Sequence, residues 1–159
     1  MRSSGQRELR SRTSKTEKIA SIFSDEPLDY HTPKEISLKL DMDIRLVTSI
    51  VNRLKAEGLV ERIGRGRYRL KMDQEIDEET ISGIRGELAS MSQVILGIPG
   101  RDEKDRMNTT PFKQLVSLYM MVDNIGGRTM ARNLLRLSGK KYLDDDSVDR
   151  LLLSVEEVT

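Results

Sequence analysis

The 159-residue sequence has no cysteine, no tryptophan and a single histidine, His31. Without cysteine there is no disulfide framework, no thiolate metal site and no cysteine nucleophile. One histidine excludes the usual multi-histidine zinc sites and weakens any Ser/His/Asp interpretation. We therefore expect no metal, no cofactor and no enzymatic activity. Because His31 directly precedes a helix start, we expect it to lie at the surface.

Long apolar runs are also missing. No stretch approaches the roughly 20 apolar residues that a bilayer-spanning helix needs. The basic N-terminus is not followed by an apolar segment, as it would be in a secretory signal. We therefore expect a cytoplasmic protein. Since aromatic residues make up only 4% of the chain, its core must be aliphatic.

Charge is balanced overall but not along the chain. Residues 1–71 hold 16 Lys and Arg against 10 Asp and Glu, a net charge of +6, and residues 72–159 hold 11 against 16, a net charge of −5. A run of acids after Met72 marks the change. We place a domain boundary there and expect the basic half to face a polyanion.

The basic half opens with residues 1–13, which carry four arginines, one glutamate and no apolar periodicity. This pattern predicts a disordered basic arm, either a solvated tail or a segment that tracks phosphates. Ordered structure is predicted to begin at Ser14, because Ser14-Lys15-Thr16-Glu17 fits a capping box. The first helix must end before Pro27.

Two further helices and a hairpin follow. Thr32-Pro33-Lys34-Glu35 has the residues of a helix start, and this short helix ends near Asp41. Asp43 caps the next helix, whose apolar stripe has helical spacing and comprises Val47, Ile50, Val51 and Leu54. Two β-prone segments around Gly64-Arg65-Gly66 then predict a hairpin, in which we expect Glu61 to pair with a neighbouring cation.

Residues 14–71 resemble the winged helix-turn-helix superfamily of DNA-binding domains, notably the MarR-like and ArsR-like regulators. The resemblance is carried by Thr32 to Ile36, Val47 to Leu54, Glu57 to Arg62 and Gly64 to Tyr68. It implies three helices and a two-stranded β-hairpin wing. It also implies that the third helix enters the major groove while the wing touches the minor groove or the backbone.

The outer face of the third helix has the chemistry that this role needs, since it carries no acid before Glu57. Asn can read adenine and Arg can read guanine. The candidate base-reading residues are Arg45, Thr48, Ser49 and Asn52. The candidate backbone contacts are Arg53, Lys55, Arg65, Arg67 and Arg69. For Thr48, Ser49 and Arg65, the alternative is an ordinary solvated surface.

The acidic half, residues 72–159, is predicted to be an all-α domain. Its first helix carries apolar residues at intervals of 3, 4, 3 and 4, namely Ile81, Ile84, Leu88, Met91 and Ile95. This seam is either a dimerisation surface or one wall of an intramolecular bundle. We expect Gly97 to Thr110 to form a loop.

Three more helices are predicted after that loop. They start at Thr110-Pro111, at Arg128-Thr129 and after Asp144. Gly126-Gly127 indicates a turn between helices, with an anion site as the alternative. Asp144-Asp145-Asp146 indicates a helix cap, with a divalent metal site as the alternative.

Together these features predict a mainly α protein: an N-terminal winged helix-turn-helix domain followed by an all-α C-terminal domain for dimerisation or partner binding. The expected function is sequence-specific binding of double-stranded DNA by a homodimeric transcriptional regulator. The alternative is an adaptor that docks on protein partners in a replication, segregation or transcription assembly. In either case the C-terminal helices offer a surface for a protein partner.

Overall fold

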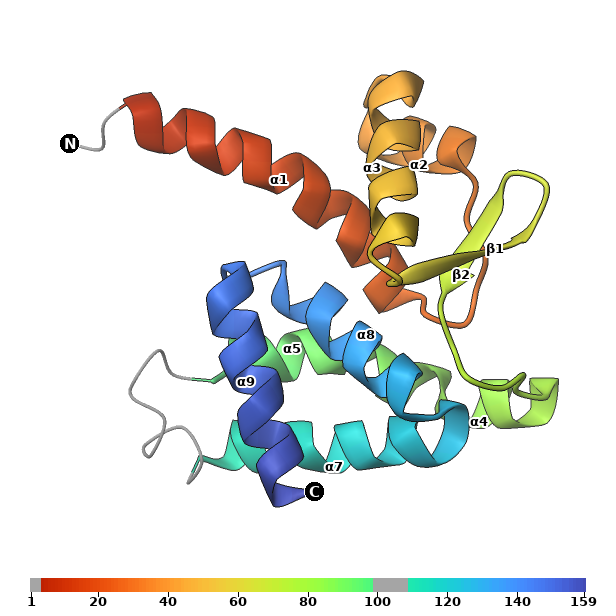
Figure 1. Ribbon diagram of the computed structural model, residues 1–159, viewed down its shortest axis with the longest axis vertical. Helices are drawn as coiled ribbons and strands as arrows, with labels where there is room; N and C mark the ends of the chain where they lie inside the picture. The colour runs from red at the N-terminus through yellow and green to blue at the C-terminus, as the bar shows by residue number, and fades with distance from the viewer. Residues whose placement is uncertain (1–3, 99–108) are drawn as a thin grey trace.

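The computed structural model describes residues 4–98 and 109–159. The chain is mainly helical, with one two-stranded antiparallel sheet (Figure 1). In chain order the elements are α1 (Ser4–Asp25), α2 (Pro33–Leu40), α3 (Ile44–Ala56), β1 (Val60–Gly64), β2 (Arg67–Leu70), α4 (Glu78–Ala89), α5 (Met91–Leu96), α7 (Thr110–Gly126), α8 (Arg128–Gly139) and α9 (Asp145–Val158).

Helix α1 corrects the predicted start of order. It begins at Ser4, ten residues before Ser14, so the first helix is not capped at Ser14, and residues 4–13 are helical where an irregular arm was predicted. Arg, Gln, Glu and Leu all favour helix, and extending an existing helix costs much less than starting one. The absence of apolar periodicity therefore did not prevent helix formation. The end of α1 at Asp25 agrees with the prediction from Pro27.

The caps of α2 and α3 form as the sequence predicts. The Glu35 amide donates to the Thr32 hydroxyl at 3.1 Å, and the Thr32 amide donates back to the Glu35 carboxylate at 3.2 Å. At α3 the Asp43 carboxylate accepts from the Arg45 amide at 2.8 Å. Gly58 follows α3 with φ of 78°, a left-handed conformation that glycine adopts without strain. These caps fix where α3 begins and ends.

The hairpin is confirmed, with β1 and β2 paired antiparallel and an irregularity between Arg62 and Gly64. Gly66 supplies the turn with φ of 70°. The expected partner of Glu61 is Arg69, directly across the ladder, with 3.4 Å between their charged atoms. The hairpin is therefore an ordered element with its Arg-containing turn at the free end.

His31 is buried, which corrects the prediction that it lies at the surface. Only 5% of the residue is exposed, and its ring packs edge-on against Phe23 with centroids 5.3 Å apart. The cause is backbone pairing: the His31 amide donates to the Tyr68 carbonyl at 2.7 Å, and the Tyr68 amide donates back at 2.9 Å. This bridge joins the segment between α1 and α2 to β2.

The seam predicted over Ile81 to Ile95 is divided between two helices. The Ser90 amide donates to the Glu87 carbonyl, and the Ser90 hydroxyl donates to the Gly86 carbonyl at 3.0 Å. The Ser90 amide thus bonds three residues back instead of four, and the helix is interrupted at this residue. Leu88, Met91 and Ile95 are buried in the chain's own core. For these three residues, burial within the chain favours the bundle-wall alternative over a dimer seam.

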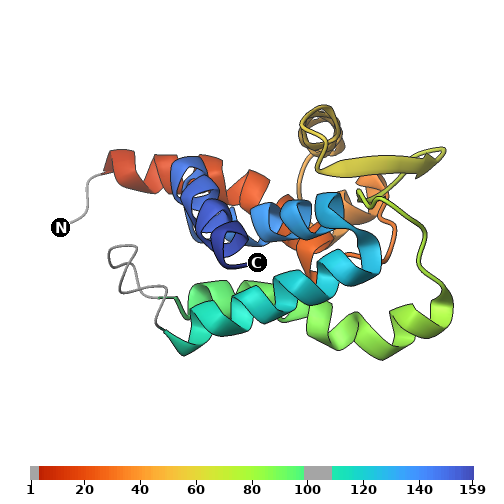
Figure 2. The same cartoon turned by 60° about the horizontal axis from the view of Figure 1, so that its bottom comes forward.

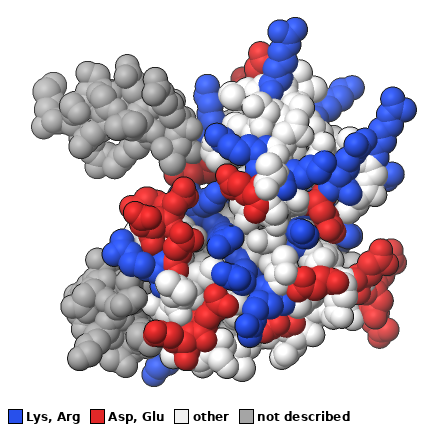
Figure 3. Space-filling model, in the orientation of Figure 1, with Lys and Arg blue, Asp and Glu red and all other residues white. Residues whose placement is uncertain are grey.

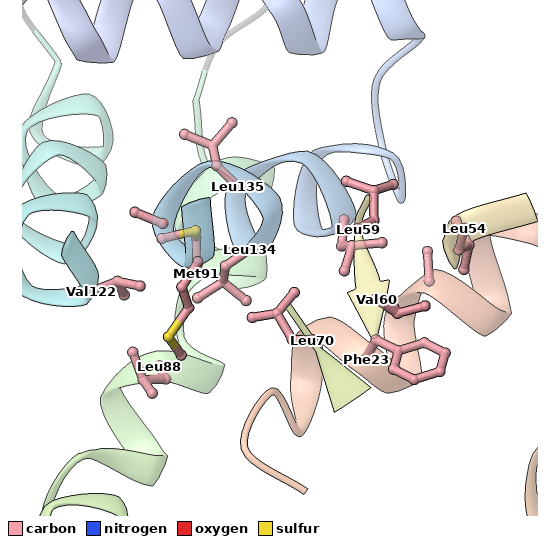
Figure 4. Close-up of a cluster of buried hydrophobic side chains, with 14 of the residues drawn as sticks. Phe23, Leu54, Leu59, Val60, Leu70, Leu88, Met91, Val122, Leu134 and Leu135 are labelled. Atoms are coloured by element: carbon pink, nitrogen blue, oxygen red, sulfur yellow. The ribbon is translucent and has the colours of Figure 1, made fainter. Parts of the chain in front are cut away.

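A single hydrophobic cluster runs through both halves of the chain. Helix α8 lies at its centre and packs against α1, β2, α5, α7 and α9. Figure 4 shows Leu134 of α8 among side chains from both halves, including Leu70 of β2 and Met91 of α5. The change in charge after Lys71 is therefore not matched by a break in the core.

Polar contacts also join the N-terminal and C-terminal halves of the chain. The Asn133 amide group donates to the Gly58 carbonyl at 2.8 Å, and the Lys140 ammonium lies 3.2 Å from the Glu57 carboxylate. The Thr129 amide at the start of α8 donates to the Asp73 carboxylate at 2.9 Å. The glycine pair is therefore a turn between helices, and the chain's own Asp73 lies at the helix N-terminus that the alternative had assigned to a bound anion.

The Asp triplet caps α9, as the sequence predicts: the Asp144 carboxylate accepts from the Ser147 amide at 2.7 Å. Within the described residues no group of three or more acidic or histidine side chains is arranged to hold a metal ion. Most of the loop predicted from Gly97 to Thr110 lies outside the described residues.

Substituting Gly127 tests the α7–α8 turn. Gly127 has φ of 94°, and a Cβ there would lie 2.2 Å from an Asp73 carboxylate oxygen. Gly127→Ala should destabilise the fold by about 1–3 kcal/mol, the cost of holding a side chain in this backbone region. Gly83→Ala is the matched control, because a Cβ at Gly83 meets open space, and alanine there should stabilise α4 by up to about 1 kcal/mol. Urea unfolding measures both, and equal effects would contradict this account of the turn.

The aspartate caps make stability sensitive to acid. Hydrogen bonds from the Thr80 and Ser147 amides lower the pKa of Asp77 and of Asp144 from the ordinary value of 3.8. A lowered pKa in the folded state gives stability that is complete above the ordinary value and is lost as pH falls through the lowered one. A variant with Asp77→Ser and Asp144→Ser keeps capping side chains that do not titrate. Between pH 6 and pH 3 its urea midpoint should fall less than that of the natural chain, and an equal fall would contradict the assignment.

Candidate nucleic-acid interface

Helix α3 has two distinct faces. Its buried face is the predicted stripe, made of Val47, Ile50, Val51 and Leu54. At 3.6 residues per turn, Arg45, Ser49 and Asn52 fall on the opposite side of the helix, and all three are exposed. The core contacts of α3 therefore leave these polar side chains pointing outward.

Most of the outward-facing side chains of α3 have no hydrogen-bond partner within the described residues. Within the described part of the chain, the side chains of Arg45, Ser49 and Asn52 make no hydrogen bond and no ion pair. Thr48 differs, because its hydroxyl donates to the Ile44 carbonyl at 2.8 Å. Arg45, Ser49 and Asn52 thus keep their hydrogen-bonding capacity for an external ligand, while the Thr48 proton is already used.

Arg53 and Lys55 flank this outward face, and both are exposed. One guanidinium nitrogen of Arg53 donates to the Thr16 hydroxyl of α1 at 3.1 Å. That partner is neutral, but Arg53 also lines a pocket with Glu17, Glu57, Asp144 and Asp145, so nearby acids partly balance its charge. Lys55 is therefore the better suited of the two to contact anions beside the helix.

The hairpin contributes three predicted arginines, Arg65, Arg67 and Arg69, and their neighbours differ. Arg65 is exposed at the turn, and within the described residues it has no charged partner. The Arg67 guanidinium lies 5.3 Å from the centre of the Tyr30 ring, an attraction that holds the side chain without neutralising it. Arg69 is paired with Glu61, so it adds less positive potential than Arg65 or Arg67.

Two residues of this surface were not predicted from the sequence. Arg62 is exposed on β1, where its guanidinium Nε donates to the Gly64 carbonyl at 3.2 Å. Tyr30 is 52% exposed beneath Arg67. The alternation of β1 gave a usable signal for Arg62. No sequence signal places Tyr30 there, because it reaches the hairpin only through the bridge between His31 and Tyr68.

Three acids of this region have partners within the chain. Asp43 caps α3, Glu57 pairs with Lys140, and Glu61 pairs with Arg69. Figure 3 shows Lys and Arg side chains gathered over α2, α3 and the hairpin, with acidic side chains prominent around α4 below them. The local field is therefore positive although the whole chain is nearly neutral.

The α3 helix and the hairpin lie on one side of the molecule, and α4, α5 and α7 lie on the opposite side (Figures 1 and 2). We call the surface formed by α3 and the hairpin the basic face; its members are Arg45, Thr48, Ser49, Asn52, Arg53, Lys55, Arg62, Arg65, Arg67 and Arg69. Of the predicted dimerisation residues, Ile81 and Ile84 are half-buried. They lie on α4, on the side of the molecule opposite α3.

Comparison of the chain with protein-family models, curated proteins and solved structures gives no match. Among the described helices, none combines the length and hydropathy needed to cross a bilayer.

Removing the partner of Arg69 tests the charge arrangement of the basic face. Glu61→Gln should strengthen binding to heparin, a generic polyanion, because it leaves the Arg69 charge uncompensated. Glu157→Gln is the matched control, since it removes one negative charge from an exposed position on α9. Heparin chromatography should show Glu61→Gln eluting at higher salt than Glu157→Gln. Equal retention would mean that the basic face is not the polyanion-binding surface.

Proposed function

We propose that the chain binds double-stranded DNA sequence-specifically through the basic face and acts in the cytoplasm as a homodimeric transcriptional regulator. The main support is the outward side of α3, where Arg45, Ser49 and Asn52 are exposed and free of partners in the described chain. These are side-chain types that bond base edges in the major groove. The uncompensated cations at the hairpin turn supply the phosphate contacts that position such a helix.

The arrangement of elements also favours a winged helix-turn-helix module in residues 14–71. Helices α2 and α3 are joined by a short turn in which Asp41 has φ of 51°, and a hairpin follows α3 directly. The His31–Tyr68 bridge adds a third extended segment beside that hairpin. With 13 residues, α3 is about 20 Å long, and the major groove of B-DNA admits a helix.

A homodimer is part of this proposal because one module offers few base contacts. Two copies related by a two-fold axis would read a pseudo-palindrome with half-sites about one helical turn apart. The basic face of each copy must then stay uncovered, which leaves the side of α4, α5 and α7 for pairing. Light scattering of the free chain and of its DNA complex measures this stoichiometry.

One observation favours the alternative of a protein-docking adaptor. Leu38 on α2 is 75% exposed, beside a pocket lined by Ile22 and Ile36. An apolar side chain at such a position suits a protein partner more than a phosphate backbone. Under this alternative, Leu38→Asp would abolish function while DNA affinity stayed low and unchanged.

Charge reversal at the hairpin turn tests DNA binding. Arg65→Glu should weaken binding to duplex DNA by at least about tenfold at low salt, because it removes one phosphate contact and adds repulsion. Lys113→Glu makes the same charge change at an exposed position on α7, on the opposite side of the molecule, and should change affinity by less than about twofold. Fluorescence anisotropy with labelled duplex measures both.

The salt dependence of affinity provides the control. Binding of the natural chain must weaken steeply as salt rises, because neutralising phosphates releases counterions. The slope for Arg65→Glu should be shallower by about one contact. A flat salt response, or equal losses for Arg65→Glu and Lys113→Glu, would contradict DNA binding by this surface.

A further inference from the structure

An aliphatic side chain is exposed at the start of α3, beside the polar side chains of the basic face. Ile44 is the first residue of the helix and is 47% exposed. Isolated apolar residues on a surface are common, so exposure alone assigns no role. The position matters more, because the N-terminal residues of a helix in the major groove are the ones that reach base edges.

Thr48 extends this apolar surface by one turn. Residues four apart lie on the same side of a helix, so Thr48 lies beside Ile44. Its hydroxyl bonds to the Ile44 carbonyl at 2.8 Å and is thereby turned back toward the helix backbone. The γ-methyl group is then the part of Thr48 left for an outside contact. The sequence had suggested a polar role for Thr48, but this hydrogen bond favours an apolar one.

We infer that Ile44 and Thr48 form a specificity element that recognises the 5-methyl group of thymine. This inference rests on the proposed binding of duplex DNA by α3. In the major groove the C5-methyl of thymine is the apolar group that side-chain methyls contact. Asn52, one turn beyond Thr48, carries the amide that pairs bidentately with adenine. The N-terminal part of α3 therefore suits a half-site that contains A·T pairs, with thymine facing Ile44 and Thr48.

Replacing thymine with deoxyuridine tests the inference, because the exchange removes only the 5-methyl group. Duplexes bound by the natural chain are first selected from a randomised pool, and each thymine of the selected site is then replaced singly. At one or two positions per half-site, affinity should fall about three- to fivefold, as expected for the loss of one buried methyl-sized group. At other thymines the affinity should not change.

Variants then assign the effect to side chains. Ile44→Ala should bind the thymine and deoxyuridine duplexes with nearly equal affinity, and Ile44 lies outside the buried core. Thr48→Ser removes the γ-methyl and should reduce the preference for thymine, whereas Thr48→Val keeps a methyl and should retain it. Leu38→Ala, a change at another exposed aliphatic residue, should leave the preference as in the natural chain. Circular dichroism checks that each variant is folded.

The outcomes separate this inference from the proposed function. If the chain binds DNA with the expected salt dependence but shows no position where deoxyuridine weakens binding, methyl recognition is wrong and DNA binding stands. If Ile44→Ala weakens binding to both duplexes equally, Ile44 contributes contact without discrimination and the inference fails. If no salt-dependent DNA binding is found, the proposed function fails and this inference fails with it.

Discussion

Burial of helix α8 is the packing constraint on which the rest of the structure depends. Met130, Leu134 and Leu137 are fully buried, and Leu135 on a different side of the helix is buried as well. A helix that is buried over most of its circumference must be covered from several directions. Here α1 and β2 cover it from the basic half and α5, α7 and α9 from the acidic half. The two halves are therefore held together by one shared helix.

Contacts with α8 fix the position of the C-terminal end of α3. Asn133 of α8 bonds to Gly58 just after α3, and Lys140 pairs with Glu57 at the end of α3. The C-terminal end of α3 is thus attached to the central helix, while its N-terminal end and the hairpin turn extend toward solvent. The same geometry keeps the acids of α4 away from the basic face.

Local signals in the sequence were sufficient for most of the N-terminal elements. The Thr32 and Asp43 caps, the stripe from Val47 to Leu54 and the glycines around Arg65 each depend on neighbours within a few residues, and the structure agrees with them. The exposure of Arg45 and Asn52 also follows from helical periodicity. These features are predictable because propensity, capping and burial all favour the same conformation.

Several features that the sequence did not reveal depend on contacts between distant segments. His31 is buried because its backbone pairs with Tyr68. The division of the Ile81 to Ile95 seam is local instead, at the Ser90 amide that bonds to Glu87. The start of α1 lacked any apolar pattern to mark it. The shared core around α8 was hidden by the change in charge after Lys71, since surface charge and buried packing involve different residues. Tyr30 lies beneath Arg67 because of the same His31–Tyr68 pairing.

Nuclear magnetic resonance shows residue by residue whether DNA contacts α3 and the hairpin. The backbone amides of the labelled chain are followed while duplex DNA is added at moderate salt. The account predicts that the largest shift changes fall in residues 44–56 and 60–70, with little change in α7. Changes concentrated in α7 or α9, or no change with any duplex, would contradict it.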